Sequence, residues 1–159
     1  MTKKTGKVIM TCGTICCGKS TYARKIQAEG NAVILSIDEI TLALFPEGAG
    51  ELHDTYVLRA EQYLLELSLQ ILQRGVDVIL DWGLWTRAVR NRIRAFYASH
   101  GGIQTELHYL QIDPAEWRRR IEKRNASGEA AYYVNEDLLR KVGALFEEPS
   151  EEEVDVRAE

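Results

Sequence analysis

The segment Gly13-Thr14-Ile15-Cys16-Cys17-Gly18-Lys19-Ser20 matches the pattern G-x-x-x-x-G-K-[ST], in which a loop wraps around the phosphates of a nucleotide. The apolar run 7–11 before it predicts a buried strand, and residues 20–29 after it predict a helix. Backbone N–H groups converge where such a loop meets a helix N-terminus, and the helix dipole favours negative charge there. The segment therefore predicts a binding site for a nucleoside triphosphate.

Each residue type in this loop has a chemical role. Gly13 and Gly18 allow backbone angles and a close approach that a Cβ atom would hinder. Lys19 is a compact cation that can reach the β- and γ-phosphates, and the Ser20 hydroxyl can ligate Mg²⁺. We therefore expect residues 13–21, up to and including Thr21, to bind the nucleotide, with Ser20 on the metal.

Strands and helices alternate along the rest of the chain. Three further apolar runs, 32–37, 76–81 and 104–112, predict strands. The leucines of residues 51–74, Leu58 among them, recur at helical spacing, and we expect further helices at 87–100, 113–124 and 135–146. Alternation of this kind predicts an α/β fold in three layers, α/β/α, around a parallel sheet of four to five strands.

Composition indicates one soluble domain. The chain has 159 residues, no apolar run approaches the length of about 20 residues that spans a membrane, and the N-terminus has no apolar signal region. We therefore expect a cytoplasmic protein without membrane contact. Residues 147–159 have a net charge of −6 against −4 for the whole chain, so the rest is close to +2. We expect one domain over residues 1–150 and an acidic, flexible tail over 151–159.

All three cysteines, Cys12, Cys16 and Cys17, lie in or beside the phosphate loop. Adjacent cysteines are poorly placed for a structural disulfide, and the sequence has no second Cys/His cluster for zinc. The simplest interpretation is that they are small loop residues in a reducing compartment. A thiolate made reactive by the helix N-terminus is the alternative.

Two carboxylates follow predicted strands, at the edge where open α/β sheets bind ligands. Asp38, in Ser36-Ile37-Asp38-Glu39, is the first candidate for a catalytic residue, because a carboxylate there can accept a proton from an attacking hydroxyl or orient it. The alternative is that Asp38 only caps the next helix. Asp81 is expected to hold Mg²⁺ through water and to lie near the substrate, the alternative being an exposed acid at a strand end.

The segment after Asp81 holds further candidates for substrate contact. Trp82 and Trp85 flank a glycine and could form a wall against an aromatic or sugar substrate, although such residues are more often part of a core. Arg87 and Arg90 follow directly and are candidates for contact with the substrate. The alternative for these arginines is a solvated helix face.

A second group of arginines lies in the predicted helix 113–124. Arg120 and Arg124 are four residues apart, so they share one face of that helix. Two guanidinium groups on one face can clamp a triphosphate and stabilise charge in the transition state. The alternative is again a solvated helix face.

Over residues 7–149 the chain resembles the small P-loop kinases related to the polynucleotide 5′-hydroxyl kinase domain, zeta toxin and chloramphenicol phosphotransferase, a group that includes predicted AAA-type kinases. The resemblance rests on residues 13–20, on 36–39, on 81–83 with the following Arg87, and on 124–125 leading into 134–139. It implies a nucleoside-monophosphate-kinase-like P-loop NTPase fold with a small helical lid at about 118–135.

The resemblance also implies roles for individual residues. Asp38 would be the general base for the acceptor, Arg124 a lid arginine on the phosphates, and ATP with Mg²⁺ the donor. A second lid arginine, expected a few residues beyond Arg124, is absent because residues 126–128 are Ala-Ser-Gly. Arg120 is the candidate that would replace it.

The leading hypothesis is an ATP-dependent kinase that transfers the γ-phosphoryl group to a hydroxyl of a small molecule: a nucleoside, a sugar derivative or an antibiotic. A 5′-hydroxyl polynucleotide kinase is the first alternative, ranked lower because the chain outside the tail is only mildly basic. A switch or weak ATPase that only binds ATP is the second, and it has no need of a base at Asp38. The sequence indicates no obligate protein partner.

Overall fold

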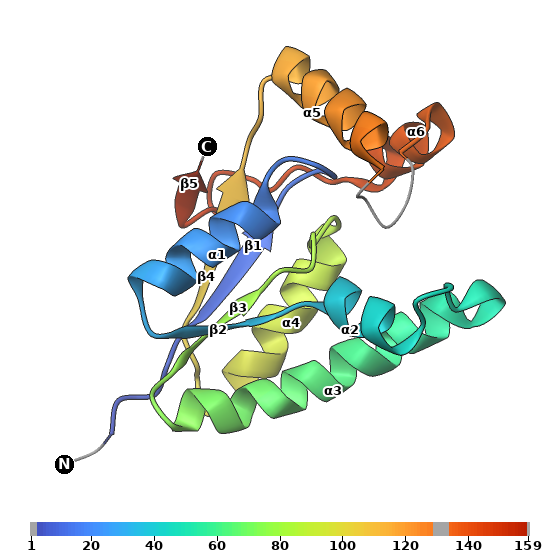
Figure 1. Cartoon of the computed structure of the whole chain (residues 1–159). Coiled ribbons are helices and arrows are strands. Elements are labelled where there is room, and N and C mark those ends of the chain that lie inside the picture. Colours follow the sequence, from blue (N-terminus) through green and yellow to red (C-terminus); the bar gives the residue numbers. More distant parts are fainter. Residues whose placement is uncertain (1–2, 129–133, 159) are drawn as a thin grey trace.

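The structure, a computed structural model, describes residues 3–128 and 134–158, and a parallel sheet of five strands lies at its centre (Figure 1). The strand order is β2-β3-β1-β4-β5, and every neighbouring pair is parallel. The predicted α/β fold with a parallel sheet is therefore confirmed. The strands are β1 (Val8–Cys12), β2 (Ala32–Leu35), β3 (Asp77–Leu80), β4 (Thr105–Leu110) and β5 (Val156–Ala158).

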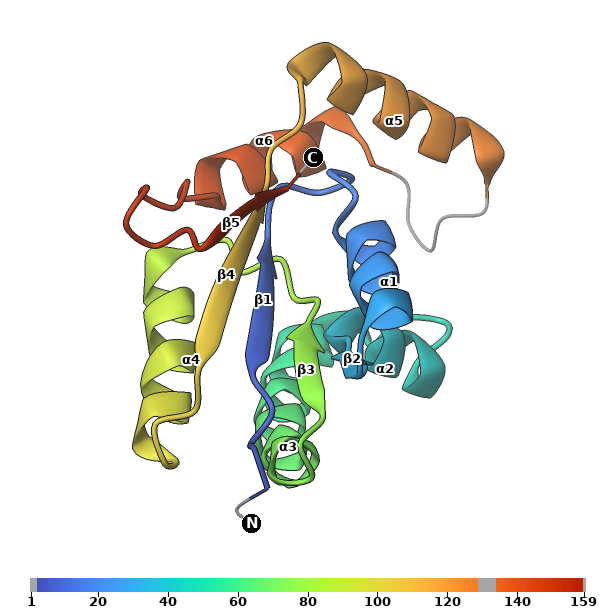
Figure 2. The ribbon, with the colours of Figure 1, turned by 90° about the vertical axis from the view of Figure 1, so that its left-hand side faces the viewer.

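Helices cover both faces of the sheet and complete the three layers (Figure 2). On one face Ala23 of the first helix packs against Ile9 and Ile79, and on the other Leu72 and Tyr97 belong to the main core. No helix in the described part of the chain is both long and apolar enough to cross a membrane. The helices are α1 (Lys19–Glu29), α2 (Ile37–Leu44), α3 (His53–Gln73), α4 (Arg87–Ser99), α5 (Pro114–Ser127) and α6 (Glu136–Leu145), with a 3-10 helix η1 (Gly50–Leu52).

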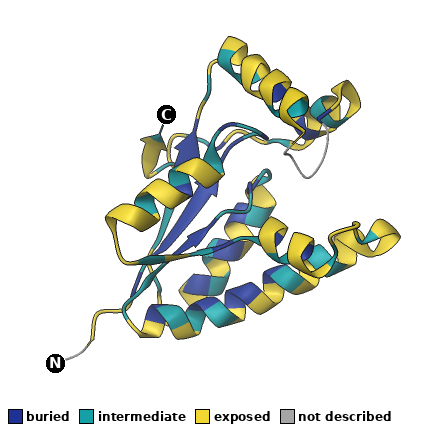
Figure 3. Ribbon diagram, in the orientation of Figure 1, coloured by how far each residue is buried: buried dark blue, intermediate teal, exposed yellow. Residues whose placement is uncertain are grey.

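Burial is concentrated in the central strands, while α5 exposes most of its surface (Figure 3). All of β1 is buried, because it lies between β3 and β4 and has helices on both faces. Strands buried on both faces are near-continuous apolar runs, as the sequence of β1 is. In both ribbon views α5 and α6 lie beyond the carboxyl ends of the central strands, on the side where the loop after β1 begins.

The C-terminal segment differs from the flexible tail expected from its charge. Residues 156–158 form β5, which pairs with β4 in the register His108↔Val156 to Leu110↔Ala158. Asp155, just before β5, accepts a hydrogen bond from the Leu107 N–H at 2.7 Å. The prediction of a flexible tail therefore fails for residues 156–158, and two of the acidic residues before them, Glu153 and Asp155, have partners far away in the sequence.

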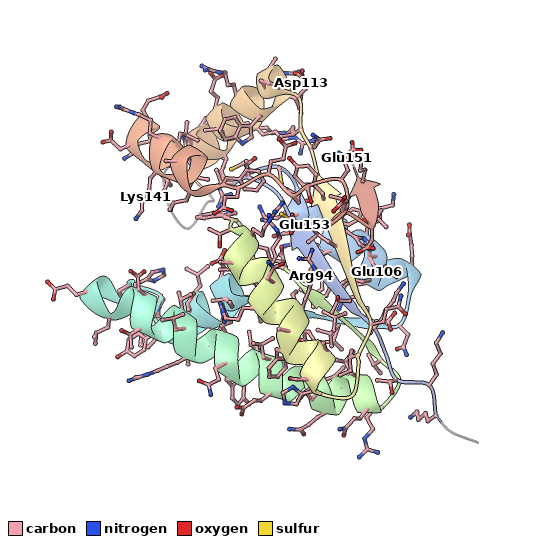
Figure 4. All side chains as sticks on the ribbon, turned by 180° about the vertical axis from the view of Figure 1, so that it is seen from behind. Arg94, Glu106, Asp113, Lys141, Glu151 and Glu153 are labelled. Atoms are coloured by element: carbon pink, nitrogen blue, oxygen red, sulfur yellow. The ribbon has the colours of Figure 1, made fainter. Side chains whose placement is uncertain are left out.

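Glu153 is the centre of that charge compensation (Figure 4). It accepts hydrogen bonds from Arg90 Nε at 3.1 Å and from Arg94 at 3.2 Å, and the Arg90 side chain is completely buried. Burial alone would raise the pKa of Glu153, but the hydrogen bonds from Arg90, the Ser150 N–H and Arg94 outweigh it and lower the pKa to about 2. The ion pair therefore fixes the C-terminal segment to α4.

Replacing Glu153 with glutamine is expected to lower the free energy of unfolding at neutral pH by roughly 3 kcal/mol, because it leaves the buried Arg90 charge without its counter-ion. A carboxylate with a lowered pKa stabilises the fold above its ordinary pKa of 4.5 and loses that effect as the pH falls towards about 2. Urea unfolding should therefore show a difference between wild type and variant that shrinks across this window.

Glu151→Gln is the matched control for this comparison. Glu151 pairs with Arg157 at 3.3 Å, but its side chain is 93% exposed. Exposed ion pairs stabilise little, so this variant should remain within about 0.5 kcal/mol of wild type. Equal losses for the two variants would contradict the account of Glu153.

Candidate active site

The loop between β1 and α1 has the backbone that its glycines predict. Gly18, the N-cap of α1, has φ of 100°, a left-handed conformation that favours glycine. At Gly13 a Cβ atom would lie 2.5 Å from Cys17 Sγ and 2.9 Å from the Leu110 carbonyl oxygen, so only glycine fits. Cys16 also adopts a positive φ, of 60°. The loop is thus tightly wound ahead of the α1 N-terminus, where N–H groups attract anions.

Lys19 lies with its ammonium group inside this loop. Its Nζ donates hydrogen bonds to the carbonyl oxygens of Thr14 at 2.7 Å and Gly13 at 3.1 Å, and lies 3.7 Å from Cys17 Sγ. The same ammonium group can donate hydrogen bonds to the oxygen atoms of a phosphate. The positive charge of Lys19 therefore lies within the loop, as the sequence pattern predicted.

Ser20 and Asp81 meet although 61 residues separate them. The Ser20 hydroxyl donates to Asp81 Oδ2 at 2.8 Å, and Thr11 Oγ1 lies 3.4 Å from Asp81 Oδ1. Hydroxyl and carboxylate oxygens are the ligands that Mg²⁺ prefers, so these residues fit a metal held chiefly by nucleotide phosphates. Within residues 3–128 and 134–158 no group of three or more His, Cys, Asp or Glu side chains could hold a metal by itself.

Asp38 lies in the first turn of α2, directly after β2, with an exposed side chain. The N-cap of α2 is Ser36, whose hydroxyl accepts a hydrogen bond from the Glu39 N–H, so the interpretation of Asp38 as the cap is wrong. The end of β2 is joined to the end of β3, since the Leu35 carbonyl accepts from the Asp81 N–H at 3.3 Å. The structure thus brings Asp38 to the sheet edge that carries Asp81.

The two tryptophans after Asp81 are partly buried and belong to different cores. Trp82 packs against the main core and donates from Nε1 to the Leu35 carbonyl at 2.9 Å. Trp85 packs beside the phosphate loop, against a second cluster that includes Ile15. Both indoles therefore have a structural role, and a role in substrate contact stays a prediction.

The arginines of α4 differ in their surroundings. Arg90 is buried and donates to the carbonyl oxygens of Leu84 at 2.9 Å and Glu147 at 3.0 Å, in addition to its bonds with Glu153. It is therefore a structural residue that joins the loop after β3 to the segment after α6, and its proposed contact with substrate is wrong. Arg87 is half-exposed, and its guanidinium lies 3.5 Å from Glu153.

Helix α5 contacts the phosphate loop through one face. Asp113 caps its N-terminus, as predicted, by accepting from the Ala115 and Glu116 N–H groups. Arg120 donates to the Cys17 carbonyl at 3.2 Å, and Arg124 lies 3.3 Å from Cys16 Sγ. The two arginines predicted from their spacing therefore both reach the loop.

The expected lid at 118–135 falls partly outside the described residues, because 129–133 are not among them. On its two sides Asn125 and Val134 are joined by two hydrogen bonds, Nδ2 to the Val134 carbonyl at 2.7 Å and the Val134 N–H to Oδ1 at 2.9 Å. Asn135 then caps α6 by accepting from the Leu138 N–H. The end of α5 is therefore tied to the start of α6.

The loop cysteines differ in burial: Cys12 and Cys17 are buried, and Cys16 is partly exposed. Burial raises the pKa of Cys12 to about 11 and also raises the pKa of Cys17. Cys12 donates to the Leu84 carbonyl at 3.5 Å, which ties the end of β1 to the loop after β3. The hypothesis of a reactive thiolate is therefore not supported for Cys12 or Cys17.

Trp117 also contacts the phosphate loop, and this contact was not predicted from the sequence. Its Nε1 donates to the Ile15 carbonyl at 2.6 Å, across 102 residues of sequence. The available signal was its spacing, since Trp117, Arg120 and Arg124 recur every three or four residues and so share one helix face.

The strand order, the glycine-bounded loop with Lys19, and the Ser20–Asp81 contact together define a P-loop nucleotide-binding domain. The sequence matches the AAA domain family over residues 8–149, nearly the whole chain, and the protein belongs to this family. No curated protein matches the sequence significantly.

Solved structures share the fold at low sequence identity. A chain of the Pnkp1/Rnl/Hen1 RNA repair complex has 19% identity and a TM-score of 0.70, with coverage of 89% of this chain and 44% of that one. A sugar kinase from Janibacter sp. HTCC2649 has 18% identity, a TM-score of 0.65 and coverage of 96% and 84%. The Mycobacterium tuberculosis APS kinase CysC, in complex with AMPPNP and APS, has 19% identity, a TM-score of 0.64 and coverage of 97% and 88%.

These similarities confirm the three-layer P-loop fold. The chain spans less than half the length of the RNA repair protein that it matches, so the activities of that whole protein do not transfer to it. The sugar kinase and the APS kinase are instead covered over most of their length. Two of the three structures named are therefore described as kinases.

Proposed function

We propose that this protein is an ATP-dependent kinase that transfers the γ-phosphoryl group to a hydroxyl of a small molecule, such as a nucleoside, a sugar derivative or an antibiotic. The observation that carries the proposal is the exposed Asp38 carboxylate, at the same sheet edge as the Ser20–Asp81 pair and the phosphate loop. An ATP-driven switch needs the loop and the metal ligands but not a second carboxylate beside them.

In the proposed reaction the acceptor oxygen forms a bond to the γ-phosphorus while the bond from that phosphorus to the β–γ bridging oxygen breaks, and ADP leaves. Asp38 orients the acceptor hydroxyl and takes its proton. Lys19 exchanges the Gly13 and Thr14 carbonyls for phosphate oxygens, and Arg124 offsets charge on the transferred group. Ser20 and Asp81 would hold Mg²⁺, which supplies charge neutralisation on the phosphates.

A 5′-hydroxyl polynucleotide kinase is the second candidate. Two observations favour it: the similarity to a chain of an RNA repair complex, and the basic surface of α5 with exposed Arg118, Arg119 and Lys123. A polynucleotide acceptor would also use the phosphate loop and Asp38. It would add contacts to the nucleic acid backbone and therefore a strong salt dependence of the acceptor KM.

The test is a screen of hydroxyl compounds with γ-labelled ATP, including nucleosides, aminoglycosides, sugars, sugar nucleotides and 5′-hydroxyl oligonucleotides. We expect a labelled phosphomonoester with a small acceptor, formed far more slowly by the Lys19→Met variant. Labelled oligonucleotide alone would favour the second candidate. Release of inorganic phosphate with no labelled acceptor in any class would overturn both.

A further inference from the structure

Helix α5 contacts the phosphate loop at residues 15 and 17, two positions where the pattern G-x-x-x-x-G-K-[ST] allows any residue. Trp117 Nε1 donates to the Ile15 carbonyl at 2.6 Å, and Arg120 donates to the Cys17 carbonyl at 3.2 Å, one turn further along the helix. Gly18 lies against the same contact, since a Cβ atom there would lie 3.0 Å from the Arg120 guanidinium. The loop therefore meets α5 through its carbonyl groups.

The side chain of Ile15 makes the same connection by packing. It is buried and belongs to a cluster with Ile121 of α5, Val134 before α6 and Val142 of α6. This cluster is separate from the main core of the sheet. Part of the phosphate loop is thus built into the small core between α5 and α6.

The geometry of a trans peptide shows which backbone N–H groups of the loop these contacts orient. The carbonyl of one residue and the N–H of the next lie in one plane and point in opposite directions. When Trp117 holds the Ile15 carbonyl outwards, the Cys16 N–H must face the other way. Arg120 likewise holds the Cys17 carbonyl, so the Gly18 N–H must point away from Arg120.

We propose that Trp117 is a positioning residue for phosphate binding: its indole N–H, assisted by Arg120, fixes the peptide planes that aim the Cys16 and Gly18 N–H groups at the triphosphate. The proposal rests on the proposed use of ATP and deepens it. It also explains why Ile15 is a large residue in this loop, because the side chain anchors the loop to α5 and α6.

Trp117→Phe tests this directly, because it removes the N–H donor and keeps an aromatic ring, smaller than the indole, for packing against the Ile15 cluster. Loss of one hydrogen bond of ordinary net strength corresponds to about a fivefold change in affinity. We expect about fivefold weaker binding of Mg·ATP and of inorganic tripolyphosphate by calorimetry. The KM for ATP should rise by the same factor while the KM for the acceptor and kcat stay within twofold, a pattern that general destabilisation would not give.

Arg120→Met is the second variant, and because Arg120 is half-exposed its replacement leaves the core intact. It should weaken tripolyphosphate binding in the same direction. Arg140→Met, which replaces an exposed arginine of α6, is the matched control and should bind like wild type. Unchanged affinity for tripolyphosphate in both Trp117→Phe and Arg120→Met would overturn the positioning role.

The same measurements separate this inference from the proposed function. If wild type binds tripolyphosphate, the variants bind it more weakly and no acceptor is phosphorylated, the positioning role stands and the kinase proposal fails. If an acceptor is phosphorylated and Trp117→Phe binds as wild type does, the kinase proposal stands and the positioning role fails. Absence of any tripolyphosphate or ATP binding to wild type would overturn both.

Discussion

Lys19→Met is expected to reduce the rate of ATP turnover by about 10²–10³-fold, the effect typical of removing one group that stabilises charge in a transition state. Lys19 is the cation inside the phosphate loop, where its ammonium lies between the carbonyls of Gly13 and Thr14. Methionine has a similar length and no charge, so the loop should keep its packing. A coupled assay of ADP formation measures the effect.

Lys25→Met provides the control, because Lys25 lies on the exposed surface of the same helix α1. It changes the net charge by the same amount and should turn over ATP like wild type. Similar losses in the two variants would mean that net charge, rather than the position of Lys19 in the loop, governs turnover.

Asp38→Asn is expected to lower the rate of phosphoryl transfer to the acceptor by about 10²–10⁴-fold, the range for removal of a general base. Affinity for ATP should stay within about twofold, because Asp38 lies at the start of α2 and not in the phosphate loop. The amide can still orient a hydroxyl but cannot take its proton. Single-turnover transfer and calorimetric ATP binding separate the two effects.

Glu39→Gln is the neighbouring control, since Glu39 also lies exposed in the first turn of α2. Its transfer rate should match that of wild type. Full transfer by Asp38→Asn with the true acceptor would show that Asp38 is not the base, and loss of ATP binding would show that its role is structural.

The order of elements was predictable because it depends on local patterns. The phosphate loop, the apolar runs and the Asp113 cap are all encoded within a few neighbouring residues, and each is present in the structure. Strand β5 was missed because it is only three residues long and lies in an acidic segment. What stabilises that segment is Arg90 and Arg94, about sixty residues earlier in the chain.

Helix α3 illustrates a second limit of pattern reasoning. Its leucines recur at helical spacing, yet Leu58 is 61% exposed whereas Leu65 and Leu72 are buried. Periodicity shows which residues share a face but not how far that face is covered. The main core, against which Leu65 and Leu72 pack, does not reach Leu58.

The site was predictable to the extent that one motif and one sheet edge define it. Ser20 and Asp81 meet and the Lys19 ammonium lies within the loop, as their positions indicated, and Arg120 and Arg124 both reach the loop. The contact from Trp117 to Ile15 depends on how α5 lies across the loop, which no local pattern encodes. Arg90 was misassigned for a similar reason, because a buried and an exposed arginine look alike in sequence.

The most direct test of the kinase proposal is the ratio of phosphorylated acceptor to ADP, measured by ³¹P NMR with wild-type protein, Mg·ATP and the acceptor found in the screen. We expect a ratio close to one, with little inorganic phosphate, and loss of most of the phosphomonoester signal in Asp38→Asn. ADP and inorganic phosphate in equal amounts, unaffected by any acceptor and by Asp38→Asn, would contradict it.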